Sequence, residues 1–177
     1  MKVLGIVGSP TAGGRTDAAV AGLLAGCTGA ETRRLSLADT DVPTVLDAME
    51  AADAVVFGSP TYRASFSSLL RSLFESAERG RYATETTAHL ARTTAAIVMT
   101  NNAPEHYLAQ DSLRSLLAGF YGCQVLSPGL VLTHPHFEGT ELTAEAAELA
   151  ASHGRALVDL TTAVLASPAL QALEPQV

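Results

Sequence analysis

The residues best suited to chemistry stand near the start of the chain, directly after an apolar run at positions 3–7. Ser9, Thr11 and Thr16 carry hydroxyl groups that donate hydrogen bonds, and Arg15 adds a forked set of donors around a fixed positive charge. Glycines in the same stretch allow the backbone to come close to a ligand. This combination suits the binding of an anion, most often a phosphate.

A strand, a tight loop and a helix must position these residues. The apolar run predicts the strand, and the residues after the loop place apolar side chains at helical spacing, at Val20, Leu23, Leu24 and Cys27. A helix that begins there points free backbone N–H groups and a partial positive charge above the end of the strand. Gly5, Gly8 and Gly13 lack the spacing of dinucleotide-binding loops, and no Gly-Lys-Ser/Thr of a Walker loop follows. An ordinary strand-to-helix turn is the alternative at this point.

Two further apolar runs also end in small polar residues. Residues 54–58 and 95–99 are apolar without alternation, which is typical of parallel strands covered on both faces. The residues that follow these runs are Ser59, Pro60, Thr61, Tyr62 and Arg63 in the first case, and Thr100, Asn101 and Asn102 in the second. Because parallel strands end at the same edge of a sheet, we expect these loops to converge with the loop after the first strand.

The rest of the chain continues the alternation of strands and helices. The expected elements are strands at residues 31–37 and 124–133, the latter interrupted near Pro128-Gly129, and helices at residues 45–52, 66–77, 105–120 and 140–166. Helical spacing assigns Leu108 and Leu149 to the inward faces of the last two helices. The polar stretch at residues 78–93 predicts a surface excursion.

This order predicts an α/β protein with a flavodoxin-like, doubly wound, five-stranded parallel sheet in the order 2-1-3-4-5. In such sheets ligands bind outside the carboxyl ends of the strands, at the switch point between the first and third strands. Ser9, Ser59-Pro60 and Thr100-Asn101 stand at those ends. We expect a single domain over residues 1–177, with a tail from about residue 167.

Composition excludes several classes of partner. The net charge of −7 argues against nucleic acid and anionic membrane surfaces, both of which reward a basic patch. No apolar run approaches the roughly 20 residues that span a bilayer, and no signal-like segment precedes the first strand, so we expect a cytoplasmic protein. Cys27 and Cys123 form neither a disulfide framework nor a metal motif. His134-Pro135-His136 has no cysteine or acidic partner at ligand spacing, so no metal site is expected.

Two motifs resemble the NADPH-dependent FMN reductase family. Gly8-Ser9-Pro10 through Arg15-Thr16 is similar to the family's phosphate loop, and Pro60-Thr61-Tyr62-Arg63-Ala64-Ser65 is similar to its Pro-x-Tyr-x-x-Ser segment beside the flavin ring. A weaker match, the helix from Glu105 to Arg114, resembles the sulfonate-system FMN reductases. The resemblance covers roughly residues 2 to 165. The chain departs from the family at Thr11, where arginine is frequent, and at Asn101-Asn102, where Gly-Gly is usual.

The resemblance implies FMN and NAD(P)H as cofactors. It assigns the FMN phosphate to Ser9, Thr11, Arg15 and Thr16, the flavin ring to Pro60, Thr61, Tyr62 and Arg63, and one end of the ring, pyrimidine or dimethylbenzene, to Asn101 and Asn102. No side chain is assigned a catalytic role, because hydride passes from the nicotinamide to the flavin itself.

The implied function is an NAD(P)H-dependent FMN reductase that transfers hydride to flavin and supplies reduced FMN to a partner monooxygenase. Two alternatives stay open. One is a quinone, azo or nitro reductase that keeps FMN tightly bound, and the other is a flavin-binding protein without reductase turnover, which the asparagines at positions 101 and 102 favour. Flavin and nicotinamide nucleotides are the expected partners, and the resemblance implies a homodimer or homotetramer.

Overall fold

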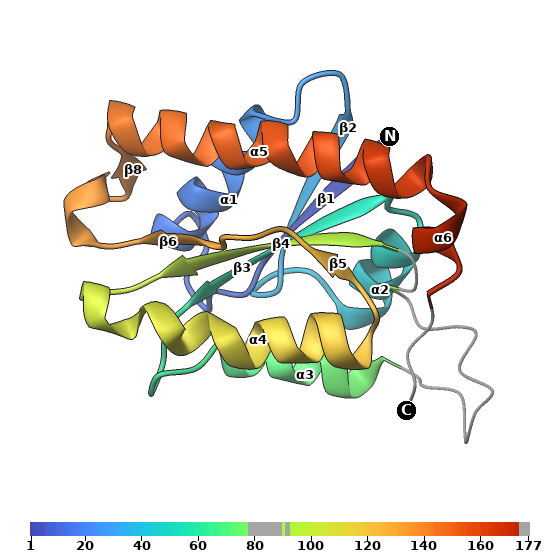
Figure 1. Ribbon diagram of the computed structural model, residues 1–177. Coiled ribbons are helices and arrows are strands. Elements are labelled where there is room, and N and C mark those ends of the chain that lie inside the picture. Colours follow the sequence, from blue (N-terminus) through green and yellow to red (C-terminus); the bar gives the residue numbers. More distant parts are fainter. Residues whose placement is uncertain (78–89, 91–92, 174–177) are drawn as a thin grey trace.

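The computed structural model describes residues 1–77, 90 and 93–173, and a parallel sheet lies at its centre (Figure 1). The predicted surface excursion at residues 78–93 lies outside these residues except for Leu90 and Thr93. The strands are β1 Lys2–Val7, β2 Glu31–Ser36, β3 Ala54–Pro60, β4 Thr94–Thr100, β5 Gln124–Val125 and β6 Leu130–Leu132, and a separate hairpin joins β7 Phe137–Glu138 to β8 Glu141–Leu142.

The strand order β2-β1-β3-β4-β5 confirms the predicted flavodoxin-like sheet. Two short strands share the fifth position, because β5 pairs with the start of β4 and β6 pairs with its end, both in parallel. The predicted interruption near Pro128-Gly129 is therefore confirmed. Proline has no N–H to donate to a neighbouring strand, so the ladder breaks where Pro128 stands.

Helices cover both faces of the sheet (Figure 1). They are α1 Arg15–Ala25, α2 Val42–Glu50, α3 Ser68–Ser76, α4 Asp111–Ser115, α5 Ala144–Leu165 and α6 Pro168–Gln171, with shorter turns η1 Pro104–Gln110, η2 Leu116–Phe120 and η3 His134–His136. α1 and α5 pack on one face, and α2, α3 and α4 pack on the other. None of the described helices is both long and apolar enough to span a bilayer.

Alternate residues of the central strands β1, β3 and β4 enter the two opposite cores. In β1, Val3 and Val7 face α1 and α5, whereas Leu4 and Ile6 face α2 and α3. A strand buried on both faces has no polar positions along its length, which is why the sequence shows an unbroken apolar run there.

The single helix predicted over residues 105–120 is wrong. The segment begins as the 3₁₀ helix η1, continues as one turn of α-helix in α4, and ends as the π-helical η2. Pro104 opens η1, and His106 leaves the helical region within it, with φ −89° and ψ 16°. Three residues per turn instead of 3.6 rotate the pattern, so Leu108, which was expected inside, is 57% exposed.

The predicted start and inward stripe of the last helix also need correction. Residues 141–142 pair with β7 instead of joining the helix, and Thr143 caps α5 by accepting the N–H of Ala146 at 3.2 Å. Leu149 was expected to be buried and is 40% exposed. The residues that α5 buries are mostly small: Ala146, Ala150, Gly154, Leu157, Thr161 and Val164.

Small residues allow α1 and α5 to pack closely. A Cβ at Gly154 would lie 2.1 Å from the carbonyl oxygen of Leu23 and 2.9 Å from Gly26, in α1 and its cap. Backbone atoms cannot yield as a flexible side chain does, so any side chain at position 154 must separate the two helices.

We therefore expect Gly154→Ala to lower the free energy of unfolding by about 2 kcal/mol, measured by urea denaturation. Gly119→Ala is the control, because a Cβ there meets nothing within 4 Å and the backbone φ is not positive. Equal stability of the two variants would contradict the close packing of α1 against α5.

Candidate functional site

The polar loops converge at the carboxyl edge of the sheet, at the left end of the view in Figure 1. The N–H of Gly8 donates to the carbonyl of Gly58 at 2.7 Å, and the N–H of Thr61 donates to Thr100 at 3.0 Å. The N–H of Asn101 donates to Leu132 at 2.9 Å. These bonds join the loops after β1, β3, β4 and β6, as the sequence predicted for the first three.

The loop between β1 and α1 presents unpaired backbone donors. Gly13 has a φ of +66°, a conformation that glycine adopts without strain, and Gly14 is the N-cap residue with no side-chain cap. Within the described residues, the backbone N–H groups of residues 12–16 have no hydrogen-bond partner. By contrast, Asp41, Ser67 and Thr143 cap α2, α3 and α5. The start of α1 thus has the donors and the dipole that bind a phosphate.

Hydroxyl groups surround the same loop. The buried Ser9 accepts the N–H of Thr11 at 3.2 Å, and the side chain of Thr11 is exposed. The buried Thr16 shares a 2.7 Å hydrogen bond with the hydroxyl of Thr100. This bond ties the first turn of α1 to the end of β4, so the start of the helix is fixed relative to the loops after β3 and β4.

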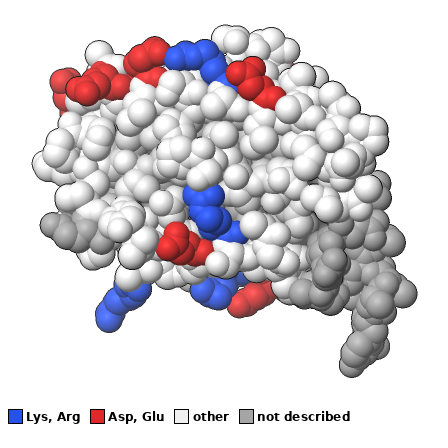
Figure 2. Space-filling view, in the orientation of Figure 1, with Lys and Arg blue, Asp and Glu red and all other residues white. Residues whose placement is uncertain are grey.

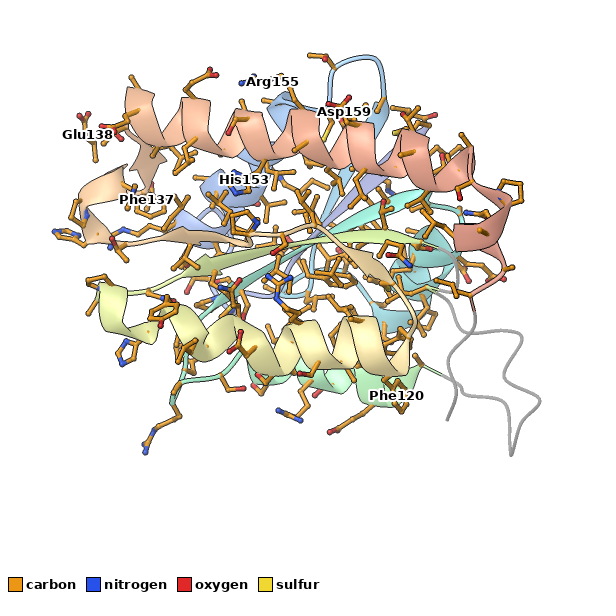
Figure 3. The ribbon with its side chains drawn as sticks, in the orientation of Figure 1. Phe120, Phe137, Glu138, His153, Arg155 and Asp159 are labelled. Carbon is orange, nitrogen blue, oxygen red and sulfur yellow. The ribbon has the colours of Figure 1, made fainter. Side chains whose placement is uncertain are left out.

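Arg15 points its guanidinium toward the segment that holds β7 and β8. Its Nε donates to the carbonyl of Gly139 at 2.9 Å, and a terminal nitrogen lies 3.0 Å from Nδ1 of His134. The guanidinium carbon lies 5.3 Å from the ring centre of Phe137, which Figure 3 shows at the same end of the molecule as the loop. Two of its donors are therefore used outside the loop, and phosphate binding by Arg15 stays a prediction from the sequence.

Thr61 and Asn101 connect the second and third loops. The hydroxyl of Thr61 donates to Oδ1 of Asn101, which is 5% exposed. Nδ2 of Asn101 is the one buried side-chain nitrogen or oxygen in the described part of the chain that lacks a partner. Buried donors are almost always paired, so an acceptor from a ligand or a water would complete this position. Pro60 is half-buried in the same loop, and Asn102 is exposed.

A strained two-residue turn follows Thr61. Tyr62 and Ser65 exchange backbone hydrogen bonds at 2.9 and 3.0 Å, and Arg63 and Ala64 between them have φ values of +51° and +58°. They are the only described residues other than glycine with positive φ. Such turns usually contain Asn-Gly, so the sequence offered no signal for this one. Tyr62 is 50% exposed at the edge of the site.

Ser59 and Ser65 hold the ends of this loop. The buried hydroxyl of Ser59 donates to the carbonyl of Pro60 at 2.8 Å and accepts the N–H of Ser67 at 2.9 Å. The hydroxyl of Ser65 lies 3.2 Å from that of Ser112 in α4. Both serines therefore have structural partners, and the loop is fixed at each end.

Exposed apolar residues on η1 flank the site and were not predicted. Tyr107 and Leu108 are more than half exposed, on the element that follows Asn101 and Asn102. Helical spacing had placed Leu108 in the core. The signal that was available was Pro104, which starts a helix and here starts a 3₁₀ turn.

Thiol and metal chemistry find no support in the described residues. Burial raises the pKa of the Cys27 thiol to about 11 and that of Cys123 to about 12, so both are protonated and inert near neutral pH. No group of three or more His, Cys, Asp or Glu residues in residues 1–77, 90 and 93–173 is arranged to hold a metal ion. His136 instead accepts the N–H of Thr133 at 3.0 Å.

Comparison with known proteins gives the class and then the family. The doubly wound parallel sheet in the order β2-β1-β3-β4-β5 defines a flavodoxin-like protein. The family model of the NADPH-dependent FMN reductases matches residues 1–137, and the chain belongs to that family. It is therefore an NAD(P)H:flavin oxidoreductase that uses FMN and NAD(P)H. Comparison of the sequence with curated proteins finds no significant match.

Solved structures share this fold at low sequence identity. The apo form of the NADH:FMN oxidoreductase EmoB matches with a TM-score of 0.77 and 18% identity, over 97% of this chain and 94% of that one. The flavoenzyme FerB from Paracoccus denitrificans, an NAD(P)H:(acceptor) oxidoreductase, matches with a TM-score of 0.74 and 21% identity, over 92% and 97%. A flavodoxin from the domain Archaea matches with a TM-score of 0.63 and 18% identity, over 92% and 99%.

Replacing Arg15 separates its two possible roles. We expect Arg15→Ala to lower the free energy of unfolding by about 1 kcal/mol, because the bonds to Gly139 and His134 and the contact with Phe137 are lost. FMN affinity, measured by fluorescence titration, should fall less than about threefold, because the guanidinium bonds to Gly139 and His134. A threefold fall in affinity corresponds to less than about 1 kcal/mol of binding free energy.

Arg155→Ala is the control, because it removes an exposed arginine far from the loop in sequence, which pairs with Glu148 on α5. A loss of FMN affinity of about tenfold or more in Arg15→Ala alone would give Arg15 the phosphate role that the sequence suggested.

Proposed function

We propose that the protein binds FMN as an exchangeable substrate, reduces it with NAD(P)H and releases it. The observation that supports this is the commitment of Arg15, the one cation of the loop, to Gly139 and His134. The phosphate is then held by backbone N–H groups and hydroxyls without a dedicated charge. Charged donors bind phosphate more strongly than neutral ones, so such a site favours release over permanent retention.

The residues at the edge fit FMN. The N–H groups of residues 12–16 and the hydroxyls of Ser9, Thr11 and Thr16 would hold the phosphate. Pro60, Thr61 and Tyr62 would line the ring from the fixed loop after β3, and the exposed Arg63 follows them in the same loop. When bound, FMN supplies the hydride-accepting chemistry, and the chain supplies position.

The third loop favours one end of the flavin. Asn101 carries a buried donor without a partner, and its Oδ1 is already used by Thr61. The pyrimidine end of a flavin carries carbonyl and nitrogen acceptors, whereas the dimethylbenzene end carries none. The sequence left open which end of the ring Asn101 and Asn102 border. Because the unpaired donor of Asn101 needs an acceptor, we propose that they border the pyrimidine end.

Release of reduced FMN also fits delivery to a second enzyme. A flavin-dependent monooxygenase is the partner that consumes reduced FMN as a substrate, and we propose such a partner. A homodimer or homotetramer, which rests on family resemblance, and a cytoplasmic location, which the sequence predicted, complete the proposal.

The test is the oxidation of NADPH by freshly purified protein, followed at 340 nm with and without added FMN. We expect little bound flavin after gel filtration and a rate that saturates with added FMN. A flavin that copurifies in equal amount, with turnover only on a quinone, azo or nitro acceptor, would support the tightly bound alternative. FMN binding without any hydride transfer would support the carrier alternative.

The proposed phosphate site at residues 12–16 can be tested by replacing one glycine inside the loop and a similar glycine outside it. Gly13 and Gly29 both have positive φ, of +66° and +80°, and a Cβ at either position meets nothing within 4 Å. Alanine should therefore cost about 1 kcal/mol of stability at each position.

Only Gly13→Ala should also weaken FMN binding, by about fivefold, because the loop relaxes away from the conformation that aligns its N–H groups. Isothermal titration of both variants with FMN makes the comparison. Equal FMN affinity in Gly13→Ala and Gly29→Ala would contradict a phosphate site in this loop.

A further inference from the structure

Arg63 occupies a conformation that a bulky residue rarely adopts. With Ala64 it forms the left-handed centre of the turn that Tyr62 and Ser65 close by two backbone hydrogen bonds. Strain of this kind persists only where the surroundings impose it, and it concentrates at binding and catalytic sites. The bond between Ser65 and Ser112 and the bonds of Ser59 supply that constraint. The turn therefore fixes the backbone of Arg63 in the loop that follows β3.

The charge of Arg63 has no partner in the described part of the chain, whereas most other described cations do. Those engaged are Arg15 with Gly139, Arg34 with Asp17, Arg71 over the ring of Phe66, Arg114 with Gln110, and Arg155 with Glu148. Lys2 and Arg33 lie near the amino ends of β1 and β2, away from the site. Among the described residues, Arg63 is thus the cation that is both exposed and unengaged at the carboxyl edge.

A substrate with several phosphates needs such a charge. The chain has a net charge of −7, so its overall field repels a nicotinamide dinucleotide. Figure 2 shows charged side chains gathered along α5 and sparse across the centre of that face. In the proposed function, the backbone donors at residues 12–16 bind the phosphate of FMN. Arg63 is not needed for that phosphate and is therefore free to bind a different anion.

We propose that Arg63 recognises a phosphate group of the nicotinamide dinucleotide and thereby sets the affinity for the hydride donor. This inference rests on the proposed function, since it requires that a nicotinamide nucleotide approaches FMN at this edge. The guanidinium binds phosphate oxygens by paired N–H donors. Either the 2′-phosphate of NADPH or the pyrophosphate common to NADPH and NADH has the required chemistry.

The experiment compares wild type, Arg63→Gly and Arg63→Lys, each loaded with FMN. NADP⁺ and NAD⁺ are titrated by calorimetry, and KM and kcat are measured with NADPH and NADH. We expect Arg63→Gly to weaken NADP⁺ binding and raise KM for NADPH about tenfold with kcat unchanged, and Arg63→Lys to restore part of the loss. If only NADP⁺ loses affinity, Arg63 binds the 2′-phosphate. If NAD⁺ loses affinity equally, Arg63 binds the pyrophosphate.

Glycine suits positive φ, so Arg63→Gly should unfold at the same temperature as wild type or higher. Arg33→Ala removes an exposed arginine elsewhere and should leave every constant unchanged. Unchanged NADP⁺ and NAD⁺ affinities in Arg63→Gly, or an equal loss of FMN affinity, would overturn the inference. Wild type that fails to bind FMN or to oxidise NADPH would instead overturn the proposed function.

Discussion

Parallel pairing of β1, β3 and β4 is the constraint on which the site depends. Val7 lies opposite Gly58, and Pro60 lies opposite Thr100, so the three strands end together. A Cβ at Gly58 would lie 2.3 Å from Val20, which shows how closely α1 rests on the end of β3. This contact brings the first turn of α1 to the same edge as the loops. A slip of one residue would turn each apolar side chain to the opposite face, so both cores fix the register.

The carboxyl edge of the sheet combines a part built from backbone N–H donors with a part built from side-chain hydrogen bonds. The part suited to phosphate consists mainly of backbone, because an uncapped helix start and a left-handed Gly13 present N–H groups without a side-chain charge. The part suited to the ring consists of side-chain hydrogen bonds, in which Thr61 and Asn101 join neighbouring loops. The first depends on backbone conformation, which Gly13 permits, whereas the second depends on the identity of its side chains. Asn101 therefore belongs to the side-chain part of this edge and not to the backbone loop at residues 12–16.

Sequence patterns predicted what depends on local chemistry. Unbroken apolar runs predicted the buried strands, the alternation of strands and helices predicted their order, and the glycines and hydroxyl groups after residue 7 predicted the loop. Long-range partners were invisible, as for Arg15, whose acceptor Gly139 lies 124 residues away in the chain. Helical spacing failed for Leu108, because η1 has a different period, and for Leu149, because close packing with α1 selects small residues on α5. The turn at Arg63 lacked the usual residues for positive φ.

An acidic protein that handles two anionic nucleotides must obtain affinity from local groups. In the proposed site, the backbone donors at residues 12–16 would attract one phosphate through the helix dipole, whose effect fades within a turn. Arg63, on a separate loop fixed by Ser65 and Ser112, is held by different contacts from those that form the proposed phosphate site. Independent sources of attraction allow one nucleotide to leave while the other stays. If FMN exchanges as proposed, this separation would matter more than tight binding, because turnover would require both the oxidised dinucleotide and the reduced flavin to dissociate.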